Sequence, residues 1–281
     1  MPRRVTVSFT GLNEGDDDMA RVAAVAAVLV LVLVLGTSGV AAASPSDVEK
    51  TVFIHYRAAP ASAGLVEQAA RTLACPDPTT CTDNRWKGNK WSAGNVSYEL
   101  NAGGVANASA AVADAFAAWT NAVTSGGGTL SVSGTTGNTA CSTAGTVMNE
   151  KNQVCWRDLT SAYPNAIAVT FILAYRSNRL IAEADTIFNS GPGFTWSYTD
   201  PGTCGTYDSC NTSTGTAGTY DIRDIGTHEF GHFLALFSDL YNGRDAELTM
   251  YGYGSTGEVK KDSLAKGDCL GITAAYGGTC P

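Results

Sequence analysis

Apolar and polar positions alternate along two stretches in the first half of the chain, and a third stretch repeats at helical spacing. Residues 51–56 and 95–101 alternate and are rich in β-branched and aromatic side chains, so both are expected to be strands. Apolar side chains recur at helical spacing over residues 108–123, which predicts an amphipathic helix. The Gly, Ser and Thr that dominate residues 125–146 predict a loop or hairpin closed by a disulfide.

The second half of the chain has two apolar strand patterns and two helical patterns. Residues 166–175 are almost continuously apolar, as in a central strand, and residues 180–189 predict a neighbouring strand after a short polar turn. Residues 190–219 lack apolar periodicity, and a loop of this length is often functional. A helix is expected to start at Asp221. A last helix is expected near the C-terminus, with an apolar face formed by Cys269, Ile272 and Tyr276.

The N-terminal region has the pattern of an export signal. Residues 19–43 combine Arg21, an unbroken apolar run and small residues at the end, which predicts a secretory signal peptide cut after Ala43. Retention as a membrane span is the alternative, although the apolar run is shorter than the ~20 residues that a span needs. Residues 1–18 are polar and acidic, so they are a doubtful extension ahead of a candidate start at Met19.

Length and charge limit the classes of protein that remain. The chain after the signal suits one domain with a single core, preceded by a small segment. Residues 44–87 precede it as a short segment, either a pro-segment or part of the domain. Asp and Glu number 26 against 18 Lys and Arg, and the basic residues are scattered, which argues against a nucleic-acid partner.

Eight cysteines follow the predicted signal, and an even count in an exported chain implies disulfides. They fall into four neighbouring couples, each of which is expected to close a surface loop. The couples are Cys75 with Cys81, Cys141 with Cys155, Cys204 with Cys210, and Cys269 with Cys280. Zinc binding by these cysteines is disfavoured because no CxxC spacing occurs.

One short motif carries metal chemistry. His228, Glu229 and His232 form the pattern HExxH, and side chains four residues apart in a helix project side by side, so two imidazoles can hold one zinc ion. Glu229 then lies beside the ion, where a carboxylate can take a proton from a zinc-activated water. The motif holds two of the three histidines in the chain, which weakens the alternative of a chance match on an ordinary helix. The third, His55, is expected to be a structural or surface histidine.

The motif and its surroundings resemble the metzincin zinc metallopeptidases, and more closely a matrixin-like branch of secreted microbial proteins. The metzincin pattern HExxHxxGxxH/D is followed by a methionine turn, and TMY around Met250 is similar to that turn. Weaker resemblance extends over residues 88–281, the expected catalytic domain. The segments concerned are YEL near Tyr98, AFAAW ending at Trp119, EADTIFN at residues 183–189 and DCLGITAAYG from Asp268. The resemblance implies an α+β fold, in which a twisted mixed β-sheet packs on the zinc-binding helix and a C-terminal helix follows.

The chain departs from the metzincin pattern at the third zinc ligand. Ala235 stands at the glycine position and Ser238 at the last ligand position, with Asp239 one residue later. Because a carboxylate oxygen binds zinc well and a neutral hydroxyl binds it poorly, Asp239 is the expected ligand. The alternative is that Asp239 is a solvated residue at the helix end. A gluzincin-like site is the rival, with Glu258 of the ExxxD pair Glu258 and Asp262 as ligand, but its glycine-rich surroundings disfavour a helix.

Further site residues follow from the resemblance. It assigns Met250 to the floor of the site and makes Tyr251 and Tyr253 candidates for stabilising the oxyanion. The histidines of the matrixin structural zinc site are missing, and Cys75-Pro76-Asp77 is only faintly similar to the cysteine switch of matrixin pro-segments. Structural calcium is compatible with the acidic, loop-rich surface, although no EF-hand-like spacing supports it.

We therefore expect a secreted zinc-dependent endopeptidase that acts on protein or peptide substrates. We expect no nucleic-acid partner and no stable membrane association once the signal is cleaved. A non-catalytic exported binding protein that retains the fold is the alternative of a different class, and Glu229 argues against it because such a protein has no need for a base. The gluzincin-type peptidase with Glu258 as third ligand also stays open.

Overall fold

The computed structural model describes residues 47–58, 77–82, 86–137, 141, 143–200, 214–235, 237–241 and 243–280. All of them belong to one structural unit, residues 45–281. The predicted signal peptide and the extension ahead of it lie outside the described residues.

The elements follow each other along the chain with strands and helices interspersed. The strands are β1 (Val48–Arg57), β2 (Asn95–Asn101), β3 (Ser131–Thr136), β4 (Gln153–Arg157), β5 (Ala166–Tyr175), β6 (Ile181–Asn189), β7 (Trp196–Ser197), β8 (Tyr220–Asp221) and β9 (Tyr253–Gly254). The helices are α2 (Ala108–Ser125), α3 (Ile222–Ala235) and α4 (Lys266–Tyr276), with a 3₁₀ turn at Gly243–Asp245. None of the helices in this part of the chain has the length and apolar character that a membrane span requires.

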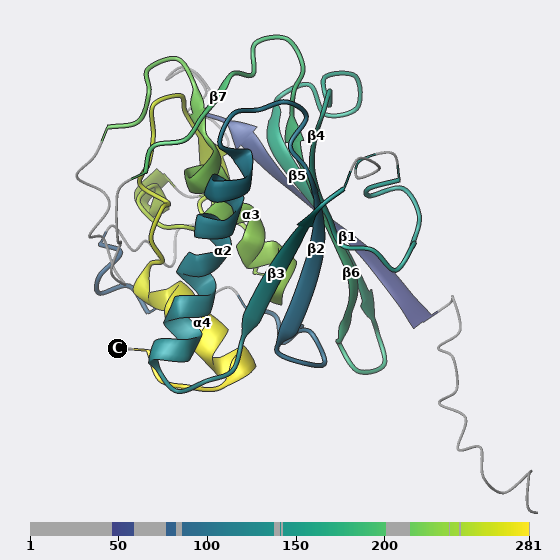
Figure 1. Ribbon diagram of the computed structural model, residues 1–281. Helices are drawn as coiled ribbons and strands as arrows, with labels where there is room; N and C mark the ends of the chain where they lie inside the picture. The colour runs from purple at the N-terminus through teal and green to yellow at the C-terminus, as the bar shows by residue number, and fades with distance from the viewer. Residues whose placement is uncertain are drawn as a thin grey trace, which may run out of the picture. The chain divides into compact units, whose positions relative to one another are not determined.

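Seven strands form one mixed sheet in the order β3-β2-β4-β6-β5-β1-β9. β2, β3, β4 and β6 run parallel, whereas β5 is antiparallel to both β6 and β1. The three helices α2, α3 and α4 lie together on one side of this sheet (Figure 1). The fold is thus a mixed α+β arrangement, as the sequence predicted at this coarser level, and most of the strand pairs in its sheet are parallel.

Most of the predicted elements are confirmed, and one prediction is wrong. The strands expected at residues 51–56, 95–101, 166–175 and 180–189 are β1, β2, β5 and β6, and the three expected helices are α2, α3 and α4. Residues 125–146 were expected to form a loop or hairpin, and the hairpin alternative is wrong, because the described part of this stretch holds one strand, β3, which pairs in parallel with β2. The short strand β4 was not predicted.

Two of the predicted disulfides are confirmed. Cys141 is bonded to Cys155 and thereby ties the loop after β3 to β4. Cys269 is bonded to Cys280, which ties α4 to the C-terminal end. The other two couples each include a cysteine outside the described residues.

Helix α3 is buried along its whole length because it lies between α2 and the sheet. The ring of Phe116 on α2 stacks on Phe230 with centroids 3.6 Å apart. The Trp119 indole N–H donates to the Thr227 carbonyl at 2.8 Å, so it satisfies a backbone oxygen inside the apolar interface. These contacts fix the position of α3, and with it the HExxH motif.

Gly231 lies where α3 packs tightly against its neighbours, and Gly231→Ala is expected to destabilise the fold by about 1–3 kcal/mol. A Cβ there would lie 2.6 Å from Met250 Sδ and 2.7 Å from the Trp119 ring, so the buried ring must shift. Gly226→Ala on the same helix is the control, since its Cβ would come no closer than 3.1 Å, the distance to the Ala115 methyl, and would lie 3.4 Å from the Phe230 ring. Replacing Gly by Ala raises the helix propensity equally in both variants, so this gain cancels in the comparison. Equal urea midpoints for the two variants would contradict this packing argument.

Candidate metal centre

Three ligand-type atoms converge at the end of the motif helix. His228 Nε2 and His232 Nε2 lie 3.2 Å apart. Asp239 Oδ1 lies 3.1 Å from the first of these atoms and 3.2 Å from the second. Donor atoms bound tetrahedrally to zinc at ~2.0–2.1 Å lie about 3.3 Å from each other. The three atoms therefore have the spacing of one face of a zinc tetrahedron.

The second nitrogen of each histidine fixes the orientation of its ring. His228 Nδ1 lies 2.8 Å from the Thr249 carbonyl oxygen, and His232 Nδ1 lies 2.5 Å from the Phe237 carbonyl oxygen. A carbonyl only accepts hydrogen bonds, so each Nδ1 carries the proton and donates it. In the neutral ring, Nε2 then has a free lone pair that points at Asp239, as metal-binding histidines require.

The electrostatics of this cluster fit a cation. Burial lowers the pKa of His228 to about 4, so this ring is neutral at neutral pH. Burial opposes ionisation of Asp239, but the charge of His232 and the close contacts with both histidine rings hold its pKa well below the ordinary value. Asp239 Oδ1 is buried without a hydrogen-bond partner, which is costly for a charged oxygen unless an ion neutralises it. Two imidazoles and one carboxylate are a donor set that zinc accepts.

Asp239 reaches the histidines because the chain folds back after α3. The Leu240 N–H donates to the Met250 carbonyl at 2.8 Å, and the Gly252 N–H donates to the Leu240 carbonyl at 2.8 Å. These bonds pair the segment that carries Asp239 with the segment that follows Met250. The Tyr241 hydroxyl donates to Asp239 Oδ2 at 2.9 Å and so leaves Oδ1 directed at the histidines.

Glu229 lies beside the cluster and is fully buried. Its Oε2 accepts a hydrogen bond from the Thr170 hydroxyl at 2.5 Å. Its Oε1 has no hydrogen-bond partner and lies 3.5 Å from His55 Nδ1. Burial raises the pKa of Glu229 to about 7, which suits a group that exchanges protons at neutral pH.

The structure brings together only some of the residues that the sequence singled out. Met250 is fully buried beside Gly231, in a turn closed by the Tyr251 N–H bonding to the Leu248 carbonyl at 3.1 Å. Tyr251 and Tyr253 contact each other, with ring centroids 5.6 Å apart. Within the described residues, the groups of three that lie close enough to hold a metal are His55 with His228 and Glu229, and His228 with His232 and Asp239. Neither Glu258 nor Asp262 belongs to these groups.

Four residues near the centre were missed by the sequence argument. Thr170 contacts Glu229, and its hydroxyl is a polar exception in the apolar strand β5, a signal that could have identified it. Tyr241, which the sequence argument did not single out, donates a hydrogen bond from its hydroxyl to Asp239. Phe53 and His55, both on β1, lie against the two motif histidines. His55 was expected to be a structural or surface histidine; it is fully buried, so the surface alternative is wrong.

Comparison with known proteins adds no assignment. No protein-family model matches the chain, and no curated protein matches it either.

Proposed function

We propose that the protein is an exported zinc-dependent endopeptidase of the metzincin type. The observation that carries the proposal is the mutual 3.1–3.2 Å spacing of His228 Nε2, His232 Nε2 and Asp239 Oδ1. The buried carboxylate of Glu229 beside them supports the same conclusion. The mixed sheet packed on α3, with α4 near the C-terminus, is compatible with the metzincin resemblance. This agreement in fold class is less specific than the HExxH motif.

The chain's own residues supply the acid–base chemistry. His228, His232 and Asp239 would hold the zinc, which when bound activates a water and polarises the scissile carbonyl. Glu229 takes the proton of the attacking water at Oε1, the carboxylate oxygen without a hydrogen-bond partner. It then gives this proton to the departing amine, so one buried group serves first as base and then as acid.

Two features support export as the setting. Cys141–Cys155 and Cys269–Cys280 are disulfides, which form and persist in oxidising compartments. The signal-like sequence of residues 19–43 agrees with them. We therefore propose that the protein works outside the cytoplasm on protein or peptide substrates.

Thr170→Val is expected to lower kcat about 10-fold with the zinc content unchanged, because Thr170 positions Glu229 without touching the metal ligands. Thr170→Ser keeps the hydroxyl and is expected to restore most of the rate. The test compares kcat, KM and zinc per chain for the two variants. Loss of zinc in Thr170→Val, or equal rates for Val and Ser, would assign Thr170 a purely structural role.

The proposal is tested with the chain that starts at residue 44, incubated with casein or gelatin. We expect cleavage that a zinc chelator abolishes and that added zinc restores. A preparation that contains no zinc and cleaves neither substrate would end the peptidase proposal and favour a binding protein.

A further inference from the structure

The candidate metal centre is closed in this structure. His228, Glu229 and His232 are all fully buried, and the side chain of Asp239 is only 7% exposed. A polypeptide cannot reach a centre that is buried to this extent. The side chains that cover the centre therefore control whether a substrate can reach it.

Strand β1 provides much of the cover. The Phe53 ring stacks on the His232 ring with centroids 3.9 Å apart and planes 5° from parallel. The His55 ring lies 4.1 Å from the His228 ring, and its Nδ1 lies 3.5 Å from Glu229 Oε1. Side chains alternate along a strand, so Phe53 and His55 share the face that points at the centre. Val52 belongs to the other face and is 38% exposed.

His55 is placed as a blocking group would be. It forms one cluster with His228 and Glu229, in which the potential ligand atoms lie within 4.8 Å of one another. It is fully buried, and neither ring nitrogen makes a hydrogen bond of normal geometry. An imidazole is itself a zinc ligand, so His55 stands close to where a fourth ligand or a substrate carbonyl would lie.

The backbone of β1 occupies a groove with two hydrogen-bonding walls. On one side it pairs antiparallel with β5, from Val48 opposite Tyr175 to Tyr56 opposite Ala166. On the other side the Tyr56 N–H donates to the Gly252 carbonyl at 3.0 Å, and β9 pairs in parallel. Extended peptides bind proteins by adding a strand to a sheet edge in this way. Without β1, the edge of β5 beside the metal centre would be free for such a peptide.

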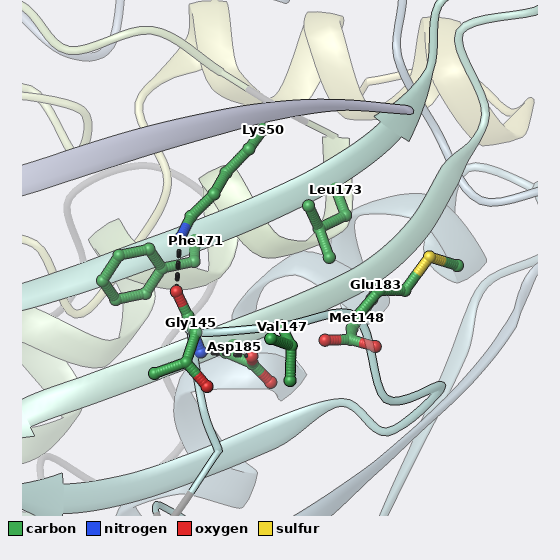
Figure 2. Close-up of a pocket in the computed structure, with 9 residues that line it drawn as sticks. Lys50, Gly145, Val147, Met148, Phe171, Leu173, Glu183 and Asp185 are labelled. Carbon is green, nitrogen blue, oxygen red and sulfur yellow. Dashed lines mark hydrogen bonds between the residues drawn. The ribbon is translucent and has the colours of Figure 1, made fainter. Parts of the chain in front are cut away.

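The outer half of β1 is held by a polar contact at the surface. Figure 2 shows Lys50 directed at the carbonyl of Gly145, to which its ammonium donates a hydrogen bond. The ammonium also lies 4.8 Å from the centre of the Phe171 ring. The Gly145 N–H donates in turn to Asp185 Oδ2 at 2.7 Å. Glu49, Lys50 and Val52 are exposed, whereas nearly all of β5 is buried, so the outer part of β1 contributes few buried side chains to the fold.

We infer that β1 is an inhibitory strand: residues 48–57 fill the peptide groove along β5, and Phe53 and His55 close the metal centre. The protein as described is then a form of low activity, because substrate enters only while β1 is transiently displaced, and its rate rises when β1 is released. This inference rests on the proposed peptidase function for the meaning of the groove, but the closure itself is tested separately.

The first test uses the intact chain from residue 44 and measures how fast a small chromophoric chelator removes zinc. Phe53→Ala/His55→Ala opens the cover and is expected to speed zinc removal at least about 10-fold, since the open form then predominates. Val52→Ala, on the opposite face of the same strand, is expected to match the wild type. Equal removal rates for all three proteins would overturn the inference.

The second test releases β1 from the folded protein. A recognition sequence for a specific protease is placed within residues 59–76, which join β1 to the domain, and the cut protein is diluted. Casein cleavage is expected to rise at least about 10-fold. A fluorescent peptide VEKTVFIHYR, the sequence of residues 48–57, is expected to rebind and restore inhibition, whereas the peptide with Ala at positions 53 and 55 binds much more weakly.

The outcomes separate the two proposals. If the cut protein binds the peptide, measured by fluorescence anisotropy, but hydrolyses nothing, the inhibitory strand stands and the peptidase function fails. If the intact and cut proteins cleave casein equally fast, the peptidase stands and the inhibitory strand fails. Failure of the peptide to rebind to cut protein that retains its zinc also overturns the inhibitory strand.

Discussion

Glu229→Gln is expected to lower kcat for peptide hydrolysis by about 10³-fold while leaving one zinc bound per chain, because a positioned base contributes ~10²–10⁴-fold. The amide matches the carboxylate in shape and can still accept the Thr170 hydrogen bond seen at Oε2. It cannot take a proton, so only the chemical step is lost. The measurement is kcat on a quenched fluorescent peptide, with zinc determined on the same sample.

Glu247→Gln is the matched control, since this glutamate is half exposed and pairs with Lys260 at the surface. It is expected to keep the wild-type rate and zinc content. Undiminished turnover in Glu229→Gln would remove the base from the proposed mechanism. Loss of zinc in that variant would instead make Glu229 a metal ligand.

Asp239→Ala is expected to weaken zinc binding at least about 100-fold, more than the ~10–100-fold typical of groups that only orient a ligand. The variant removes one of the three protein ligands and leaves the ion bound by two histidines alone. Zinc affinity is measured by competition with a chromophoric chelator.

Three further variants separate the possible third ligands. Ser238→Ala and Glu258→Ala are expected to bind zinc like the wild type. Tyr241→Phe, which removes the hydrogen bond to Asp239 Oδ2, is expected to bind zinc about 10-fold more weakly. If Glu258→Ala alone stripped the metal, the gluzincin arrangement would replace the metzincin one.

The part of the site that sequence could predict is the part that one helix builds. Residues four apart on a helix face the same way, so HExxH alone brings His228 and His232 together. The position of Asp239 beside the histidines depends on more than its distance from them along the chain. This residue reaches the histidines only because Leu240 pairs with Met250 and Gly252, contacts that the order of residues does not express.

Most of the features that sequence missed depend on pairing between distant segments. β3 joins β2 in parallel, and a Gly- and Thr-rich stretch carries no signal for a parallel partner. β1 was predicted as a strand, but its partners β5 and β9 lie more than a hundred residues further along the chain. His55 therefore looked isolated in sequence, although it lies against His228 in space.

X-ray absorption at the zinc edge of the purified protein tests the central claim, that His228, His232 and Asp239 together hold one zinc ion. The account predicts nitrogen and oxygen ligands at ~2.0–2.1 Å with the outer scattering of imidazole rings. A protein that takes up no zinc, or whose zinc has sulfur neighbours at ~2.3 Å, would contradict it.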